Sequence, residues 1–229
     1  MKHSGKARKA AFKIILISLV AGCVLWATMA IGLWIGAILS TIAVPVLIVL
    51  WILFSGFTLY FFRDPSPRVP PGDNLVLSPG HGKIDVIDTT IDPLFMGGEC
   101  RRVSMFLSVF DVHVQNAPVT GKVVFSKYTI GQFLNALKTE SSVHNENVLL
   151  GFETSEAVPR KVGVRLVAGV IARRIVPFVS QGDEVKRGDR ISLIQFGSRA
   201  EVYLPLNSTI KVKLEDHVVG GETVLAALD

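Results

Sequence analysis

The sequence predicts a two-helix transmembrane hairpin followed by a β-rich, barrel-sandwich-like domain with one short helix. Three observations lead to this fold class. Residues 14–62 contain no charged side chain, Pro and Gly gather directly after them, and the rest of the chain consists of short apolar runs separated by turn residues. These patterns are typical of membrane-spanning helices, a linker and an antiparallel β domain, respectively.

The uncharged run is long enough for two membrane spans, since one span needs about 20 apolar residues. Small residues and Pro45 near its middle predict a tight turn between helices over roughly 14–34 and 42–62. The first helix is longer than the apolar core of a cleaved signal peptide, which takes about 7–15 residues, so we expect it to be retained. The sequence therefore predicts a transmembrane helical hairpin over 14–62.

The segment 1–13 forms a basic tail without acidic residues, and its basic residues are Lys2, Lys6, Arg8, Lys9 and Lys13. Of the 24 Lys and Arg residues, the 19 that remain balance the 19 Asp and Glu residues, so the net charge of +5 does not indicate nucleic-acid binding. Basic segments next to a membrane span stay in the cytoplasm and meet anionic lipid. Because both ends of a hairpin lie on one side, we expect a cell-membrane protein whose soluble domain is cytoplasmic.

A Pro-rich linker over 63–73 leads to a domain over 74–229. Thr129–Thr139 has apolar residues at helical spacing and predicts the short helix. Short apolar runs bounded by turn residues predict strands at 75–78, 83–88, 102–108, 121–128, 147–154, 162–168, 170–177, 190–196, 200–204 and 209–214.

Two pairs of segments echo each other within this domain: 78–84 with 117–123, and 182–191 with 215–224. Each reads as a strand, a Gly turn and a return strand. Together they resemble the barrel-sandwich hairpins of biotinyl and lipoyl carriers. Neither turn carries the lysine motif of such carriers, which argues against a carrier role.

Two histidines lie in segments suited to chemistry, His81 in S-P-G-H-G-K-I and His113 in F-D-V-H-V-Q-N-A-P. If the second segment is a strand, Asp111 and His113 share one of its faces. No metal site is expected, because the histidines lack ligand spacing and no Cys-x-x-Cys pair occurs.

A Gly-Ser pair, Gly197 and Ser198, interrupts a strand-like run. A bulge or a close backbone neighbour is the structural explanation. The chemical explanation is that a serine hydroxyl attacks the carbonyl before it once a base removes its proton, and glycine leaves that approach open. Breakdown of the resulting ester turns the serine into an N-terminal pyruvoyl group, an electron sink suited to amino-acid decarboxylation. The pair alone does not decide between the two.

Six segments, taken together and in order, resemble the short, membrane-anchored phosphatidylserine decarboxylase proenzymes: Y-F-F-R-D-P (60–65), S-P-x-x-G-K (78–83), F-L-S-V-F-D-V-H-V-Q-N-A-P (106–118), N-E (145–146), A-G-V-I-A-R-R-I (168–175) and F-G-S-R (196–199). The resemblance implies autocatalytic cleavage between Gly197 and Ser198 into a β chain of 1–197 and an α chain of 198–229, which stay together as a heterodimer. It also implies a covalent pyruvoyl cofactor derived from Ser198. The reaction implied is the conversion of membrane phosphatidylserine to phosphatidylethanolamine and carbon dioxide; a homo-oligomer is left open.

The chain departs from the family pattern at three positions. His81 replaces the Asp of S-P-A-D-G, which the family uses in self-processing, Asn116 replaces a second histidine of the long members, and Asn147 follows N-E in place of Arg. The base for cleavage is therefore His113 alone or His113 together with His81.

In the mature enzyme we expect His113 to return a proton to the α-carbon after carbon dioxide leaves. Arg173 or Arg174 is expected to bind the lipid phosphate or the serine carboxylate, since a guanidinium group suits both; a solvated pair is the alternative.

A different class of protein also fits part of this pattern, namely a membrane-anchored barrel-sandwich adaptor without enzymatic activity. The hairpin echoes and the N-terminal spans support it. Such adaptors carry long helical hairpins between the two halves of the sandwich, which this sequence lacks, and they lie outside the inner membrane, on the side opposite to the one that the basic tail predicts. A processed but inactive relative is a third reading, given His81.

Overall fold

The structure is a computed structural model that describes residues 5–30, 36–132, 144–156, 158–169, 174–195 and 198–229. Its contacts divide the chain into two compact units, a helical unit over Gly5–Asp64 and a β-rich unit over Pro65–Asp229. Each unit is described by itself below.

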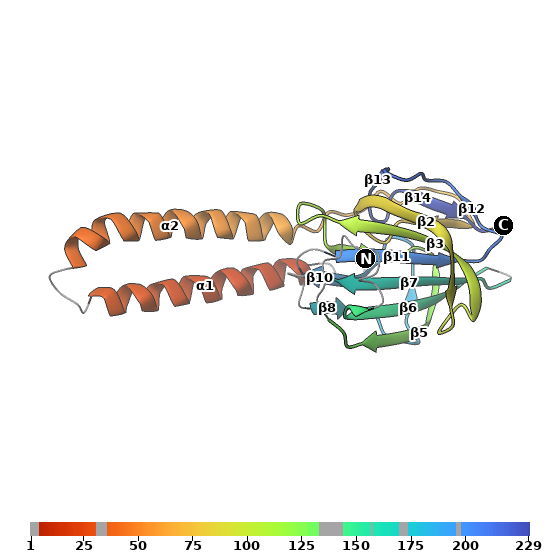
Figure 1. Ribbon diagram of the computed structural model, residues 1–229, viewed down its shortest axis with the longest axis horizontal. Coiled ribbons are helices and arrows are strands. Elements are labelled where there is room, and N and C mark those ends of the chain that lie inside the picture. Colours follow the sequence, from red (N-terminus) through yellow and green to blue (C-terminus); the bar gives the residue numbers. More distant parts are fainter. Residues whose placement is uncertain (1–4, 31–35, 133–143, 157, 170–173, 196–197) are drawn as a thin grey trace. The chain divides into compact units, whose positions relative to one another are not determined.

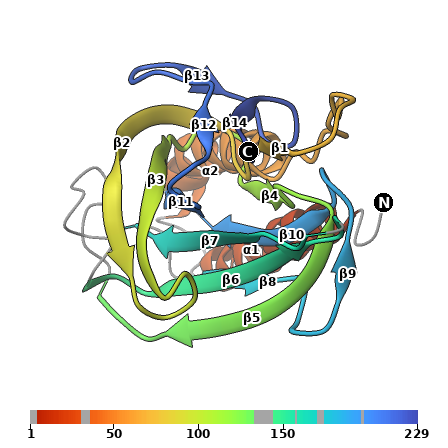
Figure 2. The same ribbon diagram turned by 90° about the vertical axis from the view of Figure 1, so that its right-hand side faces the viewer.

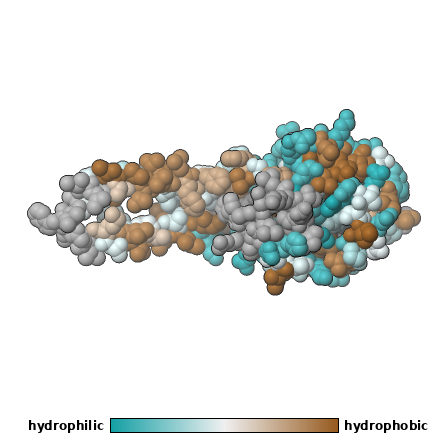
Figure 3. Space-filling view, in the orientation of Figure 1, coloured by the Kyte–Doolittle hydropathy of each residue, from teal (hydrophilic) through white to brown (hydrophobic). Residues whose placement is uncertain are grey.

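The helical unit is a pair of long helices, α1 (Lys6–Ala30) and α2 (Gly36–Phe61), each long and apolar enough to cross a membrane (Figure 1). Apolar side chains cover most of the visible surface of both helices (Figure 3). A helix that is apolar all round suits lipid rather than water. Trp51 of α2 donates a hydrogen bond of 2.8 Å to the Ser18 hydroxyl of α1, which ties the two helices together.

Both helices begin earlier than the sequence predicts. Part of the basic tail, from Lys6 onward, belongs to α1, and Gly36, Ser40 and Thr41, expected in the turn, lie inside α2 together with Pro45. Residues 31–35, between the two helices, lie outside the described residues. A Pro in a helix removes one backbone hydrogen bond, which α2 accommodates without ending.

The described residues of the β-rich unit form fourteen strands, and every ladder between them is antiparallel (Figures 1 and 2). They are β1 (Leu75–Leu77), β2 (Gly82–Asp92), β3 (Gly98–Leu107), β4 (Val114–Asn116), β5 (Gly121–Thr129), β6 (Asn147–Thr154), β7 (Lys161–Ala168), β8 (Arg174–Pro177), β9 (Glu184–Val185), β10 (Arg190–Gln195), β11 (Ser198–Leu204), β12 (Thr209–Ile210), β13 (His217–Val218) and β14 (Val224–Ala227).

One large sheet forms the frame of this unit, with strand order β13-β2-β3-β11-β7-β6-β5-β9. Figure 2 shows it curling from β13 through β2 and β3 to β5 and β9. Two small sheets, β4-β10-β8 and β1-β14-β12, complete the unit. The main apolar core includes residues from the large sheet and from both small ones, among them Val103, Val164, Ile194 and Leu225.

The two echoes of the sequence fold into equivalent, interlocked hairpins. β9, in the first segment of one echo, pairs with β5 so that Val185 lies opposite Gly121. β13, in the second, pairs with β2 so that Val218 lies opposite Gly82. A Cβ at Gly82 would come within 2.3 Å of the Phe106 carbonyl oxygen, and one at Gly121 within 1.9 Å of the Glu153 carbonyl oxygen. The glycine of the shared P-x-x-G-K pattern is therefore required by close backbone approach.

The eight-stranded sheet is covered on both faces. Along β11, Ala200, Val202 and Leu204 belong to the main core, whereas Tyr203 belongs to a second apolar cluster on the opposite face. Because side chains alternate along a strand, residues of even number on β11 face the main core and residues of odd number face away from it.

Two expectations from the sequence need correction. Residues 109–111 form a turn and the strand begins only at Val114, so Asp111 and His113 are not successive residues on a strand face. Thr129, the expected start of the short helix, is the last residue of β5. Residues 133–143 lie outside the described residues, so the rest of that helix stays a prediction.

Candidate active site

Ser198 is the first residue of β11, a strand in the middle of the large sheet. Its backbone pairs with Leu107 on one side and with Ala168 on the other. By strand alternation, its side chain faces the main core together with Ala200. Ser198 is completely buried, so a serine that follows a glycine lies at the edge of a packed core rather than in a solvated loop.

The hydroxyl of Ser198 has no hydrogen-bond partner among the described residues. Buried polar groups in native proteins nearly always have such a partner, and an exception calls for a reason. Gly197, the other half of the expected cleavage site, lies outside the described residues, as does Phe196.

His113 lies directly before β4 and is completely buried. Its carbonyl oxygen accepts a hydrogen bond of 3.1 Å from the Ile194 amide of β10, four residues ahead of Ser198. β10 runs from there toward Ser198, and its residue Ile194 packs in the main core, the side that Ser198 faces. The small sheet therefore brings His113 to the end of the core where β11 begins.

The ring of His113 is oriented by a backbone group. Its Nδ1 lies 3.0 Å from the carbonyl oxygen of Asp111. A carbonyl oxygen only accepts hydrogen bonds, so Nδ1 carries the proton and Nε2 of the neutral ring carries the lone pair. The Asp111 carboxylate in turn accepts a 2.8 Å hydrogen bond from the Ser108 amide, which fixes the turn that holds this carbonyl.

His81 is placed at the same end of the large sheet. The next residue, Gly82, begins β2 and approaches Phe106 and Leu107 of β3, while Ser198 lies on the other side of Leu107. The His81 ring also adjoins Asn116 of β4, because both lie 3.0 Å from where a Cβ on Gly220 would be. Two positions at which the chain departs from the family pattern, His81 and Asn116, are thus neighbours.

The N-E-N segment packs beside Ala168, the strand partner of Ser198. The Asn145 amide group donates a 2.7 Å hydrogen bond to the Ala168 carbonyl, and the Ala168 amide donates one of 2.9 Å to the Glu146 carbonyl. Desolvation, followed by a hydrogen bond to the Glu146 carboxylate, raises the pKa of Tyr128 above its ordinary value. Glu146 is itself buried, so a carboxylate lies close to the site.

Of the two arginines expected to bind substrate, Arg174 is exposed and opens β8, opposite Gln195 of β10. Its charge acts on Tyr128 and lowers that pKa slightly against the larger raising effects. Arg173 lies outside the described residues.

Sequence reasoning missed an ion pair next to the site. Arg199, completely buried, donates hydrogen bonds to both carboxylate oxygens of Asp85, at 2.8 and 2.5 Å. The only signal in the sequence is the Arg that follows the Gly-Ser pair. Its partner lies 114 residues away along the chain and cannot be identified without the strand register.

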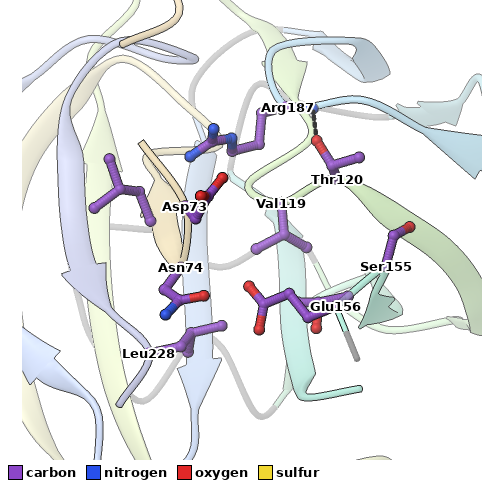
Figure 4. A pocket seen from close by; sticks show the side chains of 10 residues that line it. Asp73, Asn74, Val119, Thr120, Ser155, Glu156, Arg187 and Leu228 are labelled. Atoms are coloured by element: carbon purple, nitrogen blue, oxygen red, sulfur yellow. Dashed lines mark hydrogen bonds between the residues drawn. The ribbon is translucent and has the colours of Figure 1, made fainter. Parts of the chain in front are cut away.

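A pocket of about 280 Å³ lies elsewhere in the β-rich unit (Figure 4). Thr154, the last residue of β6, lines the pocket. Asn147, the first residue of β6, lies at the other end of this strand, where the candidate site is. The length of this strand separates the pocket from Ser198 by about 20 Å. Arg187 at its rim donates hydrogen bonds to Gly72 and Thr120 and so holds the end of the linker on the domain. None of the expected site residues lines this pocket.

Among the described residues, no group of three or more His, Cys, Asp or Glu side chains is placed to hold a metal ion. What the described residues bring together is a buried serine, two histidines and a buried carboxylate at one end of a sheet. Such a set supports acid–base and nucleophilic chemistry.

Comparison with known proteins agrees with this chemistry. Residues 54–226 match the family model described as phosphatidylserine decarboxylase. A relative from Geobacter sp. (strain M21) is 44% identical over 180 residues, covering 78% of this chain and 80% of the relative. Relatives from Symbiobacterium thermophilum and Desulfotalea psychrophila are each 40% identical, over 201 and 183 residues, covering 85% and 80% of this chain and 92% and 85% of the relatives. All three are named phosphatidylserine decarboxylase proenzyme.

Proposed function

Because the chain belongs to the phosphatidylserine decarboxylase family and is an enzyme of that class, we propose that it cleaves itself before Ser198 and uses the pyruvoyl group formed there to decarboxylate phosphatidylserine. The products are phosphatidylethanolamine and carbon dioxide. Family membership over most of the chain also favours this function over a non-enzymatic adaptor.

The observation that carries the proposal is the buried Ser198 hydroxyl, which has no hydrogen-bond partner in the described part of the chain. Leaving a hydroxyl unpaired in a core costs about 1–3 kcal/mol, so a serine kept there for structure alone would be replaced by alanine at no loss. A serine that acts as a nucleophile would be retained in spite of this cost. Its neighbours Leu107 and Ala168 are apolar and leave the hydroxyl oxygen free of competing donors in the described chain.

In the proposed cleavage, the Ser198 Oγ bonds to the carbonyl carbon of Gly197 while His113 Nε2 takes the hydroxyl proton. The bond from that carbon to the Ser198 nitrogen breaks, and the nitrogen takes up a proton, which leaves an ester. Loss of the Cα proton of Ser198 then expels the Gly197 carboxylate and leaves dehydroalanine. Water replaces the nitrogen as ammonia, and the chain end becomes a pyruvoyl group.

The residues around Ser198 fit such a group. It would be buried at the start of β11, where water has little access, next to the apolar Leu107 and Ala168. The pyruvoyl group supplies an electron sink for the bond that carbon dioxide leaves. The chain's residues bind and orient the lipid and move protons. His113, with its proton held on Nδ1 by Asp111, presents Nε2 for this work, and Arg174 is our candidate for the headgroup phosphate or carboxylate.

We also propose that His81 contributes to the cleavage. Its position at the same sheet end supports a contribution to cleavage alongside His113. The basic segment before the hairpin supports a cytoplasmic location of the β-rich unit, close to the lipid headgroups that carry the substrate.

Denaturing mass spectrometry of the purified chain tests the proposal. We expect a fragment with the mass of residues 198–229 bearing a ketone in place of the amino terminus, and carbon dioxide release from phosphatidylserine in detergent micelles. The Ser198→Ala variant should remain intact and release none. An intact parent chain, or a cut at any other bond, would overturn the proposal.

A further inference from the structure

The side chain of Arg199, the residue after Ser198, makes contacts with two neighbouring strands, β3 and β2. Arg199 lies on the face of β11 opposite Ser198, and its guanidinium group reaches over β3 to Asp85 of β2. On the way, its Nη1 also donates a 2.6 Å hydrogen bond to the Ser104 hydroxyl of β3. The two ends of the Asp85 carboxylate bind separate nitrogens of Arg199, which fixes the direction as well as the length of the contact.

Asp85 occupies a special place in β2. The register between β2 and β3 shifts between Ile84 and Val86, so Asp85 has no residue opposite it. Bulges of this kind re-aim a side chain, and they often lie beside active sites. Here the bulge turns a carboxylate toward the strand that begins with Ser198.

The proposed cleavage changes what holds Ser198 in place. In the intact chain, residue 198 is held from both sides by the backbone. After cleavage it is a chain end, and chain ends fray unless something ties them down. Ser198 is also the first described residue of β11 and lies at the end of its described ladders with β3 and with β7.

We propose that Asp85 and Arg199 are positioning residues that hold the new end of β11, and hence the reactive group made from Ser198, in register after cleavage. This rests on the proposed function. The pair suits the task because it acts from the opposite face of the sheet and needs nothing from Gly197. Arg199 is completely buried and the Asp85 side chain is 27% exposed, so solvent screens this pair less than a pair on the surface.

The same sheet offers a matched control. Arg102 of β3 also binds both carboxylate oxygens of Asp88 on β2, through Nε at 2.9 Å and Nη2 at 2.6 Å, whereas Arg199 uses Nη1 and Nη2. Asp88 pairs with Arg102 in the regular part of the ladder, farther from the site, and neither residue belongs to β11. Replacing either aspartate by asparagine removes one charge and keeps the shape.

The experiment compares the parent chain with Asp85→Asn and Asp88→Asn for extent of cleavage, and then for kcat and KM of the cleaved enzyme on phosphatidylserine micelles. We expect Asp85→Asn to lose about 10- to 100-fold in kcat with little change in KM, because the reacting atom is misplaced. Asp88→Asn should stay within about twofold of the parent, as expected for a partly exposed pair. Asp85→Glu, which keeps the charge, should recover part of the kcat.

The other possible outcomes also test the positioning role. A kcat of Asp85→Asn equal to that of Asp88→Asn overturns the positioning role while the proposed function stands. A parent chain that is neither cleaved nor active overturns the proposed function and this role with it. If Asp85→Asn is not cleaved, both substitutions are placed on the Ser198→Ala chain and unfolded in urea. Equal midpoints assign the pair to the cleavage step, and a lower midpoint for Asp85→Asn alone assigns it to folding; either result overturns the positioning role after cleavage.

Discussion

At the scale of single residues, His113 shows how a backbone group prepares a side chain. Its Nδ1 donates a hydrogen bond to the Asp111 carbonyl, so Nε2 is the nitrogen that carries the lone pair. A backbone group two residues earlier in the chain therefore helps to orient the ring.

Replacing His113 by alanine tests its assignment as the base. We expect the rate of cleavage to fall by about 10²–10⁴-fold, the usual contribution of a positioned base. The measurement is the fraction of cleaved chain against time on a denaturing gel. His144→Ala, at an exposed histidine, is the control and should cleave like the parent. Normal cleavage of His113→Ala, with loss of cleavage in His81→Ala, would move the role to His81.

Tyr203 is a second residue whose environment makes a prediction. Its hydroxyl donates a 2.6 Å hydrogen bond to the buried Glu201, and burial followed by the charge of Glu201 raises its pKa well above the ordinary value. Below pH ~10 the folded and unfolded states both keep the phenol proton. Above it, only the unfolded state loses the proton, so rising pH favours unfolding.

The free energy of unfolding should therefore fall by about 1.4 kcal/mol per pH unit above pH ~10. Urea unfolding of the uncleaved Ser198→Ala chain between pH 9 and pH 11 measures this slope. Tyr203→Phe should reduce it, whereas Tyr128→Phe, at an exposed tyrosine, should leave most of it. An unchanged slope in Tyr203→Phe would assign the pH dependence to other groups.

At the scale of elements, the two interlocked hairpins differ in residue type at one position with a positive φ. Gly182 before β9 and Glu215 before β13 make equivalent backbone hydrogen bonds, to the carbonyls of Val123 and Ile84. Both have a positive φ, of 102° and 74°. Glycine adopts this conformation freely, but a residue with a side chain pays about 1–2 kcal/mol for it.

Replacing Glu215 by glycine should therefore stabilise the domain, by about 1 kcal/mol after the extra chain entropy of glycine is subtracted. Glu215 also pairs with Lys83, but both are exposed, and such a pair contributes little. Gly182→Ala is the reciprocal change and should destabilise. Urea midpoints on the Ser198→Ala chain measure both, and a destabilised Glu215→Gly would show that the ion pair outweighs the strain.

The sequence predicted these elements unevenly. Strands with several alternating residues, such as β6 and β7, were located to within a residue, because their apolar runs and turn boundaries are strong local signals. β4, β9, β13 and β14 were not, because strands of two to four residues are defined by their partners rather than by their own pattern. Both helices begin earlier than expected, since the absence of charge marks an apolar stretch and not the helix ends.

The site was predicted to a similar degree. Ser198 and His113 were found from a chemical motif and a family resemblance, and the structure brings both to one end of the core. Their untested roles stay predictions. The Asp85–Arg199 pair was out of reach, because it depends on a bulge in β2 and on the order β2-β3-β11, which no local pattern encodes.

At the scale of the whole molecule, the proposed cleavage site directly precedes β11, the strand that joins the two parts of the large sheet. β11 separates β13-β2-β3 from β7-β6-β5-β9. Of the strands that follow it, β13 pairs with β2 and β14 pairs with β1, both from the first half of the domain, and β12 pairs with β14. We expect residues 198–229 to remain bound after cleavage. They should co-elute with residues 1–197 on gel filtration in detergent and separate only in denaturant; separation without denaturant would contradict the described sheet.

The central place of β11 has a consequence for how each molecule comes into being. If residues 198–229 were synthesised separately, residues 1–197 would form a large sheet without its central strand β11. The two unpaired strand edges would then tend to pair with each other or with other molecules. Under the proposed cleavage, the final strands must therefore pair while they are still attached, and the bond before Ser198 breaks afterwards. We then expect each copy to be assembled once, and a damaged copy to be replaced by new synthesis rather than repaired by exchange of its parts.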